Sequence, residues 1–419
     1  MVKYYKKMNF YFIGISKNGG RTMDLSRKFE SIAPSPTLAI DAKFKQMKAD
    51  GLDVVGFGAG EPDFDTPEHI KRAAIDAINA GKTKYTPASG TLELKKAVCA
   101  KFKRDNNLDY KPSQIVVSNG AKHSLINAFG AILNPGDEVI IPAPYWVSYP
   151  EMVKYNDGVP VVLHTKEANH FKFSPEEFEN CITERTKAIV LNSPCNPTGM
   201  LYDEDELRKI ADVAVKHDIF VIADEIYEHL VYGGAKHVSI ATFGEEIKKR
   251  TIIINGLSKT YAMTGWRIGF TASGEHIAKL MANVQSHTTS NPNTIAQEAA
   301  IAALNGPTKE LDFMRAAFDE RRRYMVKRIN DIDKVSCTTP YGAFYVMMNI
   351  EKLIGKKLCG RVINDADDFS DVFLEDQLVA VVSGVGFEAP HFVRWSYATS
   401  KENIKDGIDR LEALLAKAE

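Results

Sequence analysis

Lys259 lies in the stretch of the chain whose residue types are best suited to chemistry. Residues 251–254 read Thr-Ile-Ile-Ile and predict a short buried strand, so we expect Lys259 in a turn just past the carboxyl end of that strand. Ligands of open α/β sheets bind at this end. With Ser258 before it and Arg267 further along, Lys259 offers an amine that can form a Schiff base beside two groups that can bind a phosphate.

Two further candidates also follow predicted strands. Asp224 ends the strand 220–223, where burial would raise the pKa of a carboxyl that lacks a cationic partner. By residue type alone, an aspartate that caps the next turn is the more common interpretation. Asn196 follows the strand 188–191 in a loop stiffened by two prolines, although Asn-Pro-Thr-Gly is also a common turn.

The segment 118–123, Ser-Asn-Gly-Ala-Lys-His, comes where the predicted strand 115–117 gives way to a helix. Backbone N–H groups at a helix amino terminus attract anions, and a glycine lets the chain approach a ligand closely. Gly120, Ala121 and Lys122 are therefore candidates for binding a phosphate.

The elements that must position these residues alternate along the chain. Between about 114 and 272, β-branched runs at 115–117, 138–141, 161–163, 188–191, 220–223 and 251–254 are separated by helical patterns. This alternation predicts right-handed crossovers and a mostly parallel sheet. The remainder predicts a long charged helix at 309–329, a strand at 342–349 and an amphipathic helix near 403–417.

Taken together and in this order, the motifs make the chain after Met23 resemble the class I, fold-type I aminotransferases, in particular the aspartate and aspartate/prephenate branch. The resemblance implies an α/β fold: a large domain with a mostly parallel sheet of seven strands flanked by helices, plus a smaller α/β domain. It implies a flexible extension (1–22), a segment joining the small domain (23–65), a large cofactor-binding domain (66–306) and a small carboxyl-terminal domain (307–419).

The resemblance also implies pyridoxal 5'-phosphate as the cofactor. Lys259 would be the Schiff-base lysine and proton shuttle, and Asp224 would keep the pyridine nitrogen protonated. Tyr227 and Asn196 would donate hydrogen bonds to the ring oxygen. Trp146, in Pro-Tyr-Trp-Val-Ser-Tyr-Pro, would stack on the ring, although by residue type it could equally belong to the core.

The phosphate shell implied by the resemblance is Gly120, Ala121, Lys122, Ser258, Arg267 and Tyr85. Tyr85 would reach the phosphate from the neighbouring subunit, which implies a homodimer. An ordinary surface tyrosine is the alternative interpretation of this residue.

The implied substrate shell is Thr37, Gly60, Lys122, Trp146, Asn196 and Arg394. Arg394 would bind the substrate α-carboxylate through a bidentate pair, whereas a lone arginine in a strand-like run is usually a solvated surface group. Lys122 would reach a second, distal carboxylate; its alternative is a solvated lysine in the first turn of a helix.

The predicted function is the transfer of the amino group of L-aspartate to 2-oxoglutarate by a ping-pong mechanism. A prephenate or aromatic amino acid aminotransferase would share the same catalytic shell. A pyridoxal-phosphate C–S lyase would have less need for Lys122, and a transcriptional regulator would normally carry a fused DNA-binding segment, which the sequence does not show.

The composition of the chain narrows the kinds of partner and compartment that we expect. The 419 residues include 53 basic and 54 acidic side chains, so we expect neither a nucleic acid nor a membrane as a partner. The five cysteines are scattered without paired spacing, which predicts neither disulfides nor a metal site and fits a cytoplasmic protein.

Overall fold

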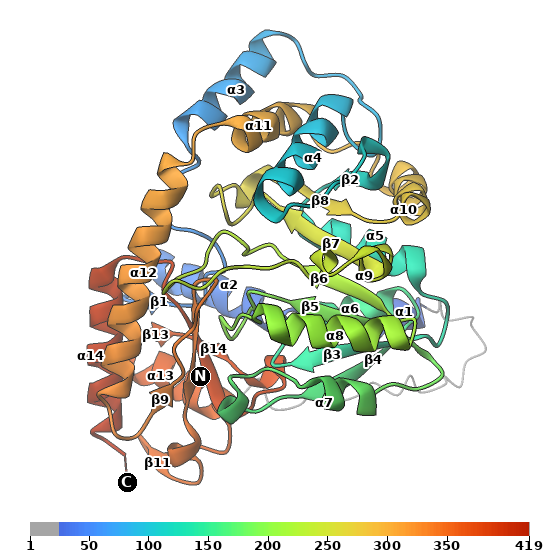
Figure 1. Cartoon of the computed structure of the whole chain (residues 1–419). Helices are drawn as coiled ribbons and strands as arrows, with labels where there is room; N and C mark the ends of the chain where they lie inside the picture. The colour runs from blue at the N-terminus through green and yellow to red at the C-terminus, as the bar shows by residue number, and fades with distance from the viewer. Residues whose placement is uncertain (1–24, 419) are drawn as a thin grey trace, which may run out of the picture.

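The structure, a computed structural model, describes residues 25–418. The extension predicted at 1–22 lies outside these residues. The main element of the described structure is a seven-stranded sheet in the order β2-β8-β7-β6-β5-β3-β4 (Figure 1). The strands are β2 (Ile115–Ser118), β3 (Glu138–Ala143), β4 (Val159–His164), β5 (Thr186–Asn192), β6 (Phe220–Asp224), β7 (Thr251–Gly256) and β8 (Gly269–Ala272).

Six strands of this sheet run in the same direction, and β8 runs antiparallel to its neighbours β2 and β7. The prediction of a mostly parallel sheet with seven strands is therefore confirmed. All six strands predicted one by one are present, but β8 was not assigned. Its four residues follow the Lys259 motif directly and carry no alternating pattern of their own.

Helices cover both faces of the sheet because its central strands alternate apolar side chains to either side. Ile252 and Ile254 of β7 pack towards one helical layer, and Ile253 packs towards the other. The first layer holds α5 (Ala121–Ile132), α6 (Ser148–Tyr155) and α10 (Glu275–Thr288). The second holds α4 (Leu92–Asn106), α7 (Pro175–Asn180), α8 (Glu204–Lys216), α9 (Glu245–Arg250) and α11 (Thr294–Asn305).

A second, antiparallel sheet is built from the carboxyl-terminal part of the chain in the order β14-β15-β10-β9. Its strands are β9 (Ser336–Cys337), β10 (Tyr345–Asn349), β14 (Val382–Ser383) and β15 (Phe392–Ser396). The helices packed with it are α12 (Lys309–Asn330), α13 (Ala366–Gln377) and α14 (Lys401–Leu415). Two further short strands, β11 (Lys357–Leu358) and β12 (Arg361–Val362), pair with each other in a separate two-stranded sheet.

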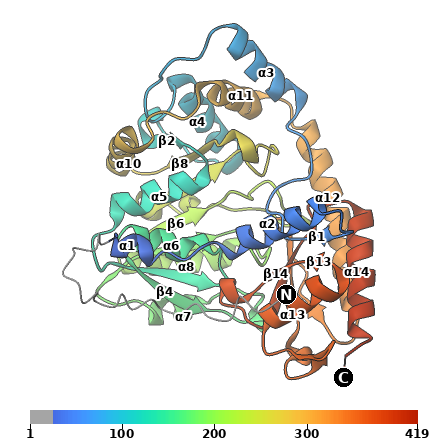
Figure 2. The same cartoon turned by 180° about the vertical axis from the view of Figure 1, so that it is seen from behind.

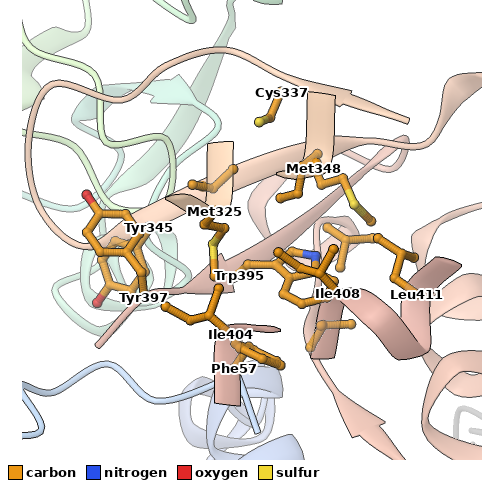
Figure 3. Packing of buried hydrophobic residues seen from close by; sticks show 14 of the residues in the cluster. Phe57, Met325, Cys337, Tyr345, Met348, Trp395, Tyr397, Ile404, Ile408 and Leu411 are labelled. Atoms are coloured by element: carbon orange, nitrogen blue, oxygen red, sulfur yellow. The ribbon is translucent and has the colours of Figure 1, made fainter. Parts of the chain in front are cut away.

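The amino-terminal segment crosses over to this second sheet (Figure 2). It contains α1 (Arg27–Glu30), α2 (Pro36–Ala49) and β1 (Val55–Gly56), and β1 pairs in parallel with β13 (Val379–Ala380). Phe57 then enters the core beside Trp395, with ring centroids 4.6 Å apart (Figure 3). Residues far apart in the sequence thus share one hydrophobic core.

The predicted helices agree with the structure to within a few residues. The long charged helix predicted at 309–329 is α12, and the amphipathic helix predicted near 403–417 is α14. Helix α3 (Glu68–Asn79) precedes the large sheet in the chain. Among the described residues, no helix is both long and apolar enough to cross a bilayer.

Candidate active site

A cavity of about 420 Å³ lies where β5, β6 and β7 end, between the two sheets. Twelve of the residues predicted for the site line it: Thr37, Gly60, Ala121, Lys122, Trp146, Asn196, Asp224, Tyr227, Ser258, Lys259, Arg267 and Arg394. The structure therefore brings together side chains from both ends of the chain and from its middle. Of the predicted site residues, only Gly120 and Tyr85 do not line this cavity.

Lys259 lies in the turn that follows β7, as its sequence context predicts. Its Nζ donates a hydrogen bond to the carbonyl oxygen of Gly60 and lies 6.0 Å from the ring centre of Tyr227. Burial lowers the pKa of the amine to about 8, and Glu61 partly opposes that shift. A larger fraction of the amine is therefore neutral near neutral pH than for an ordinary lysine.

Asp224 is the last residue of β6 and is only 4% exposed. Its Oδ2 accepts a hydrogen bond from the Tyr149 hydroxyl at 2.7 Å, and its Oδ1 accepts one from the Ile226 N–H at 3.2 Å. Burial raises the pKa of the carboxyl to about 6, against the effect of these two hydrogen bonds. No ion pair among residues 25–418 includes Asp224, so its carboxylate lacks a cationic partner.

The amino terminus of α5 and the guanidinium of Arg267 form a cradle for an anion. Gly120 precedes the helix at φ 85°, and a Cβ at this position would lie 2.5 Å from Arg267 Nη2. Arg267 Nη1 donates to the Thr264 carbonyl oxygen at 2.9 Å. Because the first N–H groups of a helix have no partner within it, those of Ala121 and Lys122 can bind an anion beside Arg267.

Lys122 and Trp146 lie together at one wall of the cavity. Lys122 Nζ is 4.8 Å from the Trp146 ring centre, and the pKa of this amine is lowered by burial and by Arg267. Trp146 also contacts the ring of Tyr149 edge to face, with centroids 5.3 Å apart. Both residues line the cavity. Lys122 is also an exposed residue in the first turn of α5, and Trp146 also packs against the core of the large sheet.

Arg394 is a buried residue of β15, not a solvated surface arginine, with 2% of its surface exposed. Its Nη1 donates to Asn196 Oδ1 at 2.9 Å, and its Nη2 donates to the Gly58 carbonyl oxygen at 3.0 Å. Nε has no hydrogen-bond partner among the described residues. The guanidinium therefore has its orientation fixed and still has a donor available for a carboxylate.

Two tyrosines of the cavity were missed by the sequence analysis. Tyr149 contacts Asp224, and Tyr345 of β10 pairs its hydroxyl with that of Tyr227 at 2.9 Å. Tyr149 lies in the same aromatic stretch as Trp146, which was the available signal. No pattern in the strand around Tyr345 distinguishes a residue that lines the cavity from one in the core.

Two predicted residues lie elsewhere or make other contacts. Tyr85 is 90% exposed and does not line the cavity of its own chain. Thr37 lines the cavity, and its Oγ1 lies 2.9 Å from Ser35 Oγ at the start of α2.

The fold and the cavity define an enzyme that holds an anionic, ring-bearing cofactor next to a reactive lysine. The chain belongs to the class I and II aminotransferases, because the model of that family matches residues 52–411. Pyridoxal 5'-phosphate is the cofactor of these enzymes. The cavity fits this group: Asp224 lacks a cationic partner, and a side chain at Gly120 would fill the space against Arg267.

Named relatives are similar over nearly the whole chain. An aspartate aminotransferase of Bacillus subtilis is 52% identical, covering 94% of this chain and 100% of its own length. An aspartate/prephenate aminotransferase of Nitrosomonas europaea is 45% identical with the same coverage of both chains. The crystal structure of the aspartate aminotransferase from Rhizobium meliloti has a TM-score of 0.92 at 43% identity, covering 95% of this chain and all of that one.

Proposed function

We propose that this protein transfers the amino group of L-aspartate to 2-oxoglutarate by a ping-pong mechanism. The observation that carries the proposal is the convergence of Lys259, Asp224 and Arg394 on one cavity. The names of the relatives, at 52% and 49% identity over nearly the full chain, support aspartate as the donor.

The proposed chemistry assigns a step to each of these residues. When bound, pyridoxal phosphate withdraws electrons from the amino acid and makes its Cα proton acidic. Lys259 would hold the cofactor through its amine and, once released by the substrate, take the proton from Cα as a base and deliver it as an acid to the carbon on the other side of the amino nitrogen. The pKa of about 8 supports this role, because the amine can act as base and then as acid near neutral pH.

The remaining residues of this group would bind the cofactor and orient its ring. Asp224 would face the ring nitrogen, Tyr227 and Asn196 would donate to the ring oxygen, and Trp146 would cover the ring plane. The phosphate would be bound by residues of the anion cradle and its surroundings, namely Gly120, Ala121, Lys122, Ser258 and Arg267.

For the substrate, Arg394 would bind the α-carboxylate through its free Nε and one Nη, close to the backbone of Gly60. Lys122 would bind a distal carboxylate, which requires its amine to leave the face of Trp146. Thr37 would lie near the substrate. These assignments predict a preference for dicarboxylic acids.

Prephenate is the second acceptor to consider, because relatives at 48% and 45% identity are named aspartate/prephenate aminotransferases. Prephenate is also a dicarboxylate, so Lys122 fits it as well as 2-oxoglutarate. An enzyme for aromatic amino acids or a C–S lyase would have less use for Lys122. We also propose a cytoplasmic location, which five free cysteines support.

The test is the absorbance of the purified protein loaded with pyridoxal phosphate. Aspartate is expected to remove the band of the cofactor bound to Lys259, and 2-oxoglutarate or prephenate is expected to restore it. The acceptor that restores it faster is the better substrate. A Lys259→Ala variant should lack this band and turnover while keeping its fold, measured by circular dichroism.

A band that aspartate leaves unchanged would overturn the proposed donor. Full turnover by Lys259→Ala would overturn the assigned lysine. Formation of pyruvate from a cysteine conjugate, without return of the band by an oxo acid, would instead establish a lyase.

A further inference from the structure

Tyr149 is the one ionisable side chain that hydrogen-bonds to Asp224 among the described residues. The titratable groups around this carboxylate are Tyr149, Cys195, Glu225, Tyr227 and Lys259. Only the Tyr149 hydroxyl, at 2.7 Å from Oδ2, is within hydrogen-bond distance. The other oxygen accepts a longer bond from the Ile226 N–H at 3.2 Å.

The packing of Tyr149 fixes the direction of this hydrogen bond. The residue is 2% exposed in the first turn of α6, and its ring packs edge to face on Trp146. Burial, together with the charge of Asp224, raises the pKa of the phenol well above its usual value. The hydroxyl therefore keeps its proton and acts as the donor.

A hydrogen bond donated to a carboxylate stabilises its charged form, whereas burial favours the neutral acid. No ion pair among the described residues includes Asp224, so Tyr149 and one backbone N–H are the main groups that oppose the effect of burial on its pKa, and the charge of Lys259 adds a smaller effect. A neutral Asp224 could not balance the charge of a protonated ring nitrogen.

We propose that Tyr149 is a positioning residue whose hydrogen bond keeps the Asp224 carboxylate ionised and oriented, so that a protonated ring nitrogen meets its counter-charge in place. This inference rests on the proposed function for the role of the cofactor. The state of Asp224 itself can be measured without the cofactor.

The test is an infrared titration of the apoprotein. The band of the protonated carboxyl that disappears in Asp224→Asn belongs to Asp224 and gives its titration midpoint. In Tyr149→Phe, which keeps the ring and its packing, we expect the midpoint to rise by about one pH unit or more, since a hydrogen bond to a charged group is lost.

Tyr232→Phe is the matched control. Tyr232 is 3% exposed, and its hydroxyl donates to the Ala343 carbonyl oxygen at 2.6 Å, outside the cavity. This variant also loses a buried phenol and one hydrogen bond, but its Asp224 midpoint should equal that of the wild type. An unchanged midpoint in Tyr149→Phe, or an equal shift in Tyr232→Phe, would overturn the proposal.

A second variant and a second readout cover other outcomes. If Tyr149→Phe does not fold, 3-fluorotyrosine at position 149 is a stronger donor and should lower the midpoint; a rise would contradict the proposal. In the loaded protein, the nitrogen-15 signal of a labelled cofactor ring should move towards the neutral position in Tyr149→Phe. Failure of the proposed function would show in the wild type, as a cofactor band unresponsive to aspartate, whatever the Tyr149 result.

Discussion

Single residues of this site have proton affinities that differ from those of the same residues in water. Burial lowers the pKa of Lys259 to about 8 and raises that of Asp224 to about 6. Each shift disfavours the charged form, so both groups reduce the stability of the folded chain in the pH range where they are charged. Such a cost at a reactive site is expected where stability and activity compete.

Asp224→Asn should therefore stabilise the apoprotein at pH 8. Because the folded-state pKa of about 6 exceeds the ordinary value of 3.8, Asp224 disfavours folding increasingly as the pH rises from about 4 through 6. Its removal should raise the free energy of unfolding by about 1–3 kcal/mol. The upper bound follows from the difference of about two units between the folded-state pKa and the ordinary pKa. Urea unfolding at pH 8 measures this, while turnover should be lost.

Below about pH 4 the gain should vanish, because Asp224 is then neutral in both states. A loss of stability in Asp224→Asn at pH 8, or the same gain at both pH values, would contradict the assignment of a buried, poorly compensated carboxylate.

Among the elements, the junction of β2 and α5 has the closest backbone approach in the site. Gly120 has φ 85° and lies against Arg267, while Gly269 of β8 lies so close to the start of α5 that a Cβ there would be 2.2 Å from the Ala121 nitrogen. Two glycines thus let a helix, a strand and a guanidinium meet around the anion cradle.

Gly120→Ala should weaken cofactor binding by about tenfold or more, because the new methyl group displaces Arg267, a charged hydrogen-bonding group. Gly136→Ala is the matched control: Gly136 has φ 89°, but a Cβ there has no atom within 4 Å. Both variants should lose similar stability from backbone strain, about 1–2 kcal/mol. Titration of the apoproteins with pyridoxal phosphate separates the loss of cofactor affinity from the loss of stability. Equal affinities in the two variants would contradict the role of Gly120.

The elements predicted correctly are those whose signal is local. Helical patterns identified α12 and α14, and runs of β-branched residues identified six strands of the large sheet. β8 was missed because its place between β2 and β7 depends on pairing with residues distant in sequence. The candidate site was predicted largely through motif resemblance. Tyr345 was missed because its partner, Tyr227, is 118 positions away.

For the whole molecule, the cavity depends on three parts of the chain. Gly60 comes from the amino-terminal segment, Asp224 and Lys259 from the large sheet, and Arg394 from the second sheet. The pairing of β1 with β13 supports the predicted union of 23–65 with 307–419. The domain limits themselves remain a prediction.

A homodimer that shares Tyr85 remains a proposal, and hybrid dimers can test it. If Tyr85 acts across the interface, a hybrid of one Tyr85→Ala chain and one Lys259→Ala chain contains one fully native site. It should show about half the wild-type turnover at a cofactor concentration that leaves the Tyr85→Ala homodimer mostly unloaded. Two affinity tags isolate the hybrid. Turnover no higher than that of the Tyr85→Ala homodimer would place Tyr85 outside the partner's site.

The hydrogen bonds of Arg394 to Asn196 and Gly58 have a consequence for the thermodynamics of substrate binding. A free arginine side chain samples many rotamers, and ordering it costs up to about 2 kcal/mol of conformational entropy. Here that ordering occurs when the chain folds, before any substrate arrives. Binding of the α-carboxylate should therefore cost little side-chain entropy at Arg394. This saving should be the same for every amino acid and oxo acid that enters the cavity.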